Sequence, residues 1–419
     1  MAPCLGPRPH GLADRWMYIK SNHVMDCNNK PAYAVQEDDS SSKDLNATVF
    51  TIGRDDQAST LPRTPKGDGY GGDETNDIIS DTDCLTLAQR DVAGVDNFPE
   101  SEVHQWEVGR FKKVKELQDA TRNFGKVILM KERSTGKQYA VKCLPNHWMR
   151  NSEAEFLAAH PGETEKPWRD LATLRHLERH SFPYLCALHG VFRDANFTFV
   201  AMNYASEGDL FSWCEKAVAP GLLREMTAQG LILQVAHGVK LLHNLGIVHG
   251  DLSLENTLVT KCENDHLRVN LIDFGASSTK RFLSTTTDGF MGKVSYQAPE
   301  IHTGQFYDGF LADAFALGVL AFSTVMSDYP WLSTIPDGCK CFTYFQEHGF
   351  NAYMRKRKVR GGTKRFQEVM SQPLQQLLGG LLELDQSNRA TLGEDVFATT
   401  GRHIALQEPW LLGNSNLSL

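Results

Sequence analysis

The chain has 419 residues, enough for two to three ordinary domains or for one two-lobed domain with an extension. Its formal net charge of −8 argues against a protein that binds nucleic-acid backbones, because such proteins are normally basic. No run of about 18 apolar residues occurs and the start lacks the basic and apolar regions of a secretory signal, so we expect no membrane span and a cytoplasmic protein.

Residues 1–105 are predicted to form a largely disordered acidic extension. Positions 36–100 hold 15 Asp or Glu against five Lys or Arg, and such a segment buries too little apolar surface to offset the entropy of ordering. A strand-like run, Thr48 to Ile52, either docks on the folded part or has no role. The composition favours a solvated linker, with an arm that docks a partner or acts as a pseudosubstrate as the alternative. We expect residues 1–100 to be dispensable for folding.

Ordered structure is predicted from about Trp106 onward. Alternating apolar residues predict strands over 127–130 and 138–142, with Gly136 in the turn between them. A proline followed by leucines at helical spacing predicts a helix over 167–178. Further helices are expected over 231–245, 311–326 and 374–384. Strands followed by a helix-rich half indicate an α+β fold, with a small β-rich lobe on a larger helical lobe and a cleft between them.

Nine cysteines are scattered along the chain. Cys339 and Cys341 lie close together, but no second Cys or His pair stands at the spacing of zinc ligands. The interpretation we favour is a set of reduced thiols in a reducing compartment.

Three short segments carry the residue types that phosphoryl transfer needs. The reaction requires a carboxylate beside the attacking hydroxyl and oxygen ligands for metal ions on the phosphates. Asp251 and Asn256 stand five apart after an apolar helix, and Asp273 follows an apolar strand 17 residues later. The third segment, Ala298 to Glu300, closes the stretch that begins at Asp273.

These motifs resemble those of the eukaryotic protein kinases over residues 106–411, with an N-terminal lobe over about 106–202 and a C-terminal lobe over about 206–411. The segment 141–148, a glycine-poor loop and Gly292-Lys293 are also similar to divergent kinases of alveolate parasites, including the FIKK group. The resemblance implies the bilobal α+β kinase fold, ATP and Mg²⁺ as cofactors, and transfer of the γ-phosphate to Ser or Thr hydroxyls of protein substrates. A pseudokinase that binds nucleotide or partners without turnover, and a small-molecule kinase, stay open as alternatives.

The resemblance also implies roles for individual residues. Asp251 is expected to be the catalytic base, with Asn256 and Asp273 as magnesium ligands. Asp313 lies where the family keeps an Asp that anchors the catalytic loop, and Arg389 where it keeps an Arg that pairs with the Glu of the third motif.

Lys142 resembles the strand lysine that grips the phosphates and pairs with a Glu on the next helix. Asp170 stands at that register here and is one methylene shorter, while Glu163 and Glu165 are alternatives that precede the helix. Segment 199–205 resembles the hinge, with Met202 as gatekeeper. The full set expected to contact the nucleotide is Gly125, Val127, Ala140, Lys142, Met202, Asn203, Ala205, Asp209, Asn256, Leu258 and Asp273.

The chain departs from the family pattern at several positions. Ala120 and Arg122 stand where two glycines of the phosphate-binding loop are usual, and Gly250 replaces the Arg of the catalytic loop. Ser253 replaces the loop Lys, and Lys293 replaces the Thr before the third motif. We expect the Lys293 ammonium to reach the place left by Ser253 and to act as the catalytic cation; the alternative is that Lys293 points to solvent.

Overall fold

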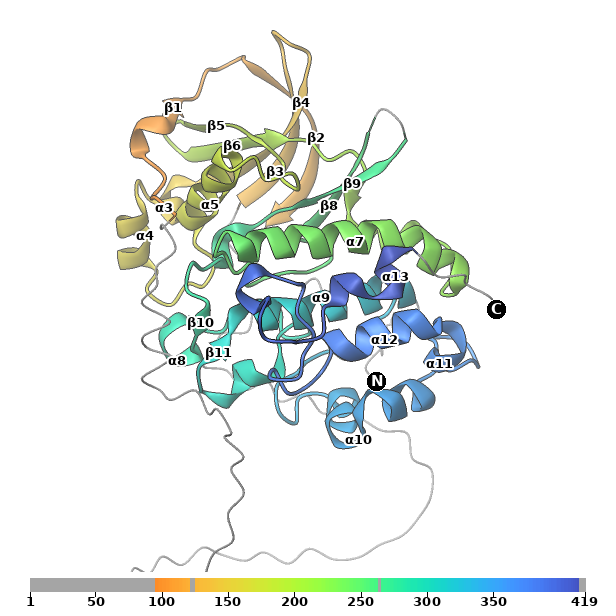
Figure 1. Cartoon of the computed structure of the whole chain (residues 1–419). Helices are drawn as coiled ribbons and strands as arrows, with labels where there is room; N and C mark the ends of the chain where they lie inside the picture. The colour runs from red at the N-terminus through yellow and green to blue at the C-terminus, as the bar shows by residue number, and fades with distance from the viewer. Residues whose placement is uncertain (1–94, 121–124, 263–264, 414–419) are drawn as a thin grey trace, which may run out of the picture. The chain divides into compact units, whose positions relative to one another are not determined.

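The computed structural model describes residues 95–120, 125–262 and 265–413 (Figure 1). These belong to the second of two units, Asp83–Leu419, into which the chain divides. The expected disorder of the acidic extension up to residue 94, the strand-like run from Thr48 to Ile52, and the loop position Arg122 lie outside the described residues.

Eleven strands are described, and they form three sheets. A six-stranded sheet has the order β1-β5-β6-β4-β3-β2, a three-stranded sheet the order β7-β8-β9, and β10 pairs with β11. The strands are β1 Val103–Gln105, β2 Phe111–Ala120, β3 Gly125–Glu132, β4 Gln138–Pro145, β5 Leu188–Arg193, β6 Phe197–Asn203, β7 Gly208–Asp209, β8 Thr257–Lys261, β9 Leu267–Leu271, β10 Phe282–Leu283 and β11 Tyr307–Asp308.

The helices gather mainly in the second half of the chain, below the large sheet in Figure 1. They are α3 Asn146–Met149, α4 Glu153–Ala159, α5 Pro167–Arg179, α6 Leu210–Lys216, α7 Leu222–Asn244, α8 Thr285–Asp288, α9 Gly309–Met326, α10 Lys340–Lys356, α11 Phe366–Val369, α12 Gln372–Leu381 and α13 Pro409–Leu412. Short 3₁₀ helices lie at Glu100–Glu102, Phe274–Ala276, Pro299–Thr303, Asp395–Phe397 and Ala405–Gln407. The expected fold class, a β-rich N-terminal lobe and a larger helical C-terminal lobe, is confirmed.

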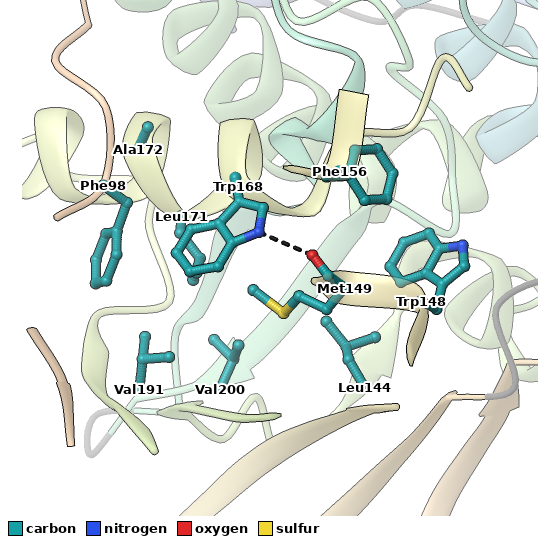
Figure 2. Close-up of a cluster of buried hydrophobic side chains, with 10 residues drawn as sticks. All are labelled: Phe98, Leu144, Trp148, Met149, Phe156, Trp168, Leu171, Ala172, Val191 and Val200. Atoms are coloured by element: carbon teal, nitrogen blue, oxygen red, sulfur yellow. Dashed lines mark hydrogen bonds between the residues drawn. The ribbon is translucent and has the colours of Figure 1, made fainter. Parts of the chain in front are cut away.

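Helix α5 is the main helix that packs on the large sheet, and the sequence predicts it almost to its ends. Proline at the first position suits the helix start, and Trp168, Leu171, Leu174 and Leu177 recur on its buried face. Figure 2 shows Trp168 at the centre of a cluster that α5 shares with α3, α4 and the strands. Its indole N–H donates to the carbonyl of Met149 at 2.9 Å, so the buried ring leaves no polar group unsatisfied.

Residues 95–105 contribute to this core, although the sequence assigned them to the extension. Phe98 is 6 % exposed and lies in the cluster of Figure 2, with its ring centroid 6.4 Å from that of Trp168. Strand β1 then pairs in parallel with β5. The sequence did not predict this role of Phe98, because one aromatic residue hardly changes the average hydrophobicity of the 65 positions in the acidic stretch 36–100.

Helix α9 lies in the core of the C-terminal lobe. It is the one helix in the described ranges that is long and apolar enough to cross a membrane, and all of its residues are buried inside the domain. That burial is typical of a core helix.

We predict that Phe98→Ala lowers the free energy of unfolding by about 3 kcal/mol, because it leaves a cavity beside Trp168. Val108→Ala is the matched control, since Val108 is 96 % exposed. Chemical denaturation of the full chain measures both.

We also predict that a chain that begins at Val95 melts at a higher temperature than one that begins at Ser101, because only the first retains Phe98. Equal melting temperatures would contradict a core role for Phe98.

Candidate active site

Asp313 of α9 anchors the loop 249–256, which carries Asp251 and is called the catalytic loop below. One carboxylate oxygen of Asp313 accepts the backbone N–H of His249 at 2.7 Å, and the other accepts that of Gly250 at 3.1 Å. The expected anchoring role of Asp313 is confirmed. Gly250 has φ of +77°, and a Cβ there would lie 2.6 Å from the carbonyl oxygen of Ala276. Glycine therefore fits this backbone, and an Arg would not.

His243 of α7 ties Asp313 to a second buried carboxylate. Its Nε2 lies 3.1 Å from Asp313 and its Nδ1 lies 2.7 Å from Glu394. Burial alone would lower the pKa of His243, but its hydrogen bonds to Asp313 and Glu394 dominate and raise that pKa to about 9. The imidazole is thus charged at neutral pH and offsets part of the negative charge beneath the catalytic loop.

Asp251 and Asn256 face each other across the loop. The amide nitrogen of Asn256 donates to the Asp251 backbone carbonyl and to its carboxylate, both at 2.8 Å. The other carboxylate oxygen of Asp251 accepts the backbone N–H of Lys293 at 3.2 Å. Burial raises the pKa of Asp251 to about 6, against the opposing effect of the Lys293 ammonium.

The β8–β9 hairpin brings Asn256 and Asp273 together. Asn256 precedes β8, Asp273 comes two residues after the end of β9, and the two strands are antiparallel, so both residues lie at the same end of the hairpin. The Ile272 N–H donates to the Asn256 carbonyl at 3.0 Å and closes this end.

Asp273 has the character of a cation ligand. Its φ is +66°, and its buried Oδ1 makes no hydrogen bond and lies 3.9 Å from the Lys142 ammonium. Across the described ranges, no cluster of three or more His, Cys, Asp or Glu could hold a metal by itself. One carboxylate and one amide oxygen nevertheless suit Mg²⁺, which keeps water and takes its remaining ligands from phosphate oxygens.

Lys142 reaches the shorter acid that the sequence proposed. Its ammonium lies 3.5 Å from Asp170, and the second oxygen of Asp170 accepts the Phe274 N–H at 2.9 Å. Burial opposes the charge on Lys142, but Asp273, Asp170 and Glu165 together raise its pKa. Burial raises the pKa of Asp170, while Lys142 lowers it. The structure therefore pairs Lys142 with Asp170, and it places Glu163 and Glu165 before α5.

Lys293 points into the site. Its ammonium donates to the Ser253 hydroxyl at 2.9 Å and to the Glu255 carboxylate at 2.8 Å, and its side chain is 14 % exposed. Burial disfavours the charge, but Glu255 and Asp251 outweigh it and raise the pKa of Lys293. The alternative of a lysine that points to solvent does not hold.

Strand register places the residues expected to line the nucleotide cleft. Val127 pairs with Lys142, Ala140 with Met202, and Asp209 with Leu258. Gly125 begins β3, and Asn203 and Ala205 follow Met202 at the end of β6. The Asp209 carboxylate also caps α6 by accepting the Ser212 N–H at 2.7 Å, a role that the sequence did not predict.

The model of the protein kinase domain family matches residues 122–411. The chain belongs to this family. Protein kinase kin1 of Schizosaccharomyces pombe is 25 % identical over 301 residues, which are 70 % of this chain and 30 % of the relative. Serine/threonine protein kinase OSK3 of Oryza sativa subsp. indica is 29 % identical over 275 residues, or 65 % of this chain and 46 % of the relative. Serine/threonine protein kinase OSK4 matches to the same extent. The chain thus spans less than half the length of these relatives.

The motifs in the sequence did not predict two features of this kinase domain. The Glu255–Lys293 ion pair joins residues 38 apart, and Glu394 lies 151 residues from His243. Charge alone gave no signal for either pairing, because both depend on how the loops fold over α9. The pair of Arg389 with Glu300, at 2.5 and 2.9 Å, was expected and is confirmed.

We predict that the His243 imidazolium stabilises the domain at neutral pH and less so in alkali. Its pKa in the folded state, about 9, exceeds the ordinary value of 6.5, so the contribution is complete below pH 6.5 and is lost as pH rises through 9. The loss is about 3 kcal/mol at most.

Urea unfolding of wild type and His243→Gln between pH 6.5 and 9.5 measures this contribution. The difference in unfolding free energy between the two proteins should shrink as pH rises. A difference that does not depend on pH would show that His243 is neutral in the fold.

Proposed function

We propose that this domain transfers the γ-phosphate of ATP to Ser or Thr hydroxyls of protein substrates. The observation that carries the proposal is the convergence of Asp251, Asn256, Asp273 and Lys142 at one site between the lobes. Two similar proteins bear the name serine/threonine protein kinase, which supports the choice of hydroxyl acceptor.

Asp251 suits the role of catalytic base. A pKa of about 6 leaves most of the carboxylate ionised at pH 7 and still basic enough to accept a proton from the attacking hydroxyl. Asn256 and the Lys293 N–H fix one oxygen each, so the carboxylate has one orientation before substrate arrives. This preorganisation lowers the cost of aligning the base in the transition state.

Asn256 and Asp273 would hold Mg²⁺, and Lys142 would hold phosphate oxygens of ATP. When bound, Mg²⁺ supplies positive charge that stabilises the transferring phosphoryl group. Asp170 keeps the Lys142 ammonium directed toward Asp273, and through the Phe274 N–H it also holds the segment that carries Asp273.

Lys293 would provide a second cation at the transferring phosphate. Its backbone N–H contacts Asp251 while its ammonium contacts Ser253, two residues further along the loop. An ammonium in this buried position stabilises developing negative charge more than one in water does. Ser253 orients the ammonium, and Glu255 balances its charge when no phosphate is near.

We predict that Asp251→Asn lowers kcat by about 10²–10⁴-fold, because the proton acceptor is lost. The rise in melting temperature on adding Mg-ATP should remain, since the residues that would hold the metal are unchanged. Asp273→Asn should instead abolish the magnesium-dependent part of that rise.

Phosphate incorporation into a generic peptide mixture, run beside thermal melting, measures both effects. A wild-type chain that binds Mg-ATP and transfers no phosphate would be a pseudokinase. An Asp251→Asn rate within tenfold of wild type would contradict the role of Asp251 as base.

We also predict that Lys293→Met lowers kcat by about 10²–10³-fold with a smaller change in KM. Its affinity for Mg-ADP with aluminium fluoride, which resembles the transferring phosphoryl group, should fall more than its affinity for Mg-ADP alone. Lys280→Met is the matched control, because Lys280 lies in the same segment and its side chain is 60 % exposed.

The double variant Ser253→Lys with Lys293→Thr returns the cation to the loop and should recover part of kcat. An unchanged kcat in Lys293→Met, in a protein that melts like wild type, would rule out the role of Lys293.

A further inference from the structure

Two thiols meet at the start of helix α10, away from the catalytic residues. Cys339 is the residue before the helix and Cys341 lies in its first turn. Both are half-buried, and neither is in a disulfide. The two thiols are close enough for Cys341 to have the largest effect on the pKa of Cys339.

A break in α10 brings a guanidinium to this pair. Arg357 follows Cys341 by 16 residues, and in a straight helix the two would lie about 24 Å apart. Gly349, with φ of +76°, interrupts the helix and turns its second half back. The Arg357 Nη1 therefore donates to the Cys341 sulfur at 3.1 Å, while its Nη2 lies 3.6 Å from Asp328.

The surroundings favour a thiolate at Cys339. The Cys341 thiol has the largest effect and, with the backbone amides of Leu332 and Phe342, lowers the pKa of Cys339 to about 5, although burial opposes it. The charged and titratable groups that face the pair are Arg357, Asp328 and Tyr353, and Lys340 separates the two cysteines in sequence. The Arg357 guanidinium contacts Cys341 and also interacts with Cys339 through its charge, and positive charge beside a half-buried thiol pair is typical of reactive cysteines.

The segment just before the pair supports the loop next to Asp251. The Trp331 indole N–H donates to the Ser295 carbonyl at 3.0 Å, and the Thr334 N–H donates to the Val294 carbonyl at 3.0 Å. Lys293 begins this loop, so the hydrogen bonds of Trp331 and Thr334 connect the segment before the thiol pair to the active site.

We propose that Cys339 and Cys341 form a reversible thiol–disulfide site that responds to peroxides. The Cys339 thiolate attacks a peroxide oxygen, a sulfur–oxygen bond forms as the oxygen–oxygen bond breaks, and hydroxide leaves when the oxidant is hydrogen peroxide. The Cys341 thiol then attacks the sulfenic sulfur, a disulfide forms and water leaves. A dithiol reductant restores both thiols by exchange.

Oxidation removes the anionic sulfur and the thiol–guanidinium contact at the start of α10. The first turn must also adjust, because a disulfide holds its two sulfur atoms about 2 Å apart. We expect the segment 331–339 to hold the Val294–Ser295 loop less firmly in the oxidised chain. This inference goes beyond phosphoryl transfer, and its thiol chemistry can be tested whether or not the chain is an active kinase.

The first test is the pH dependence of iodoacetamide labelling, followed site by site with mass spectrometry on the full chain. The labelling rate of Cys339 should change by less than about twofold between pH 6 and 9, whereas that of a free cysteine analogue rises about 200-fold. A Cys339 rate that rises like the analogue overturns the proposal.

The second test treats the chain with one equivalent of hydrogen peroxide. A disulfide between Cys339 and Cys341 should form and be reversed by dithiothreitol, and in Cys341→Ser a sulfenic acid should be trapped on Cys339 by dimedone. Cys262→Ser, which removes an exposed thiol elsewhere, should behave as wild type. Absence of both the disulfide and the trapped adduct overturns the proposal.

Hydrogen exchange then tests the consequence for the loop. The Thr334 amide should exchange at least several-fold faster in the oxidised chain, and the double variant Cys339→Ser with Cys341→Ser should show no response to peroxide. Unchanged exchange of Thr334 in a chain that carries the disulfide would overturn the link to the active site.

Discussion

The buried carboxylate of Asp313 is the constraint on which the site depends. It lies in α9, whose residues are all buried, and it accepts hydrogen bonds from two successive backbone amides of the catalytic loop. A buried carboxylate is stable only when its oxygens accept hydrogen bonds. Here one ring nitrogen of His243 contacts Asp313, and the other contacts Glu394. The core of the C-terminal lobe therefore fixes the backbone that leads into Asp251, through the amides of His249 and Gly250.

Several departures from the kinase pattern are matched by neighbouring residues. Gly250 permits a backbone conformation that passes close to Ala276, which a side chain at this position would not allow. Ser253 stands where the family has a lysine in the loop, and the ammonium of Lys293 contacts that serine. The substitution at Ser253 is therefore accompanied by a substitution at the position that contacts it.

The sequence predicted those parts of the protein that depend on local pattern. Helical spacing of leucines identified α5 and α12, and the motifs assigned Asn256 and Asp273 to one site, although the β8–β9 hairpin that brings the two together was not predicted. It missed the parts that depend on single long-range contacts. Phe98 packs in the core, but it lies in an acidic stretch whose average composition predicts disorder. Arg357 reaches Cys341 only because α10 breaks at Gly349. The FIKK-like features, the cytoplasmic location and a docking role for the extension stay predictions.

The shorter acid at position 170 shows how packing can replace side-chain length. Three hydrogen bonds join α5 and its N-cap to the segment that carries Asp273: Lys166 N–H to the Gly275 carbonyl at 3.0 Å, Phe274 N–H to Asp170 at 2.9 Å, and Thr173 with Ser277 at 3.0 Å. A Cβ at Gly275 would lie 3.1 Å from the Glu165 side chain, so glycine permits this close approach. Because the helix lies this near, an Asp spans the distance to Lys142, and the same carboxylate joins the helix to the segment that carries Asp273. The position of α5, the charge partner of Lys142 and the conformation of Asp273 are thus coupled through one side chain, so none of the three can shift without the other two.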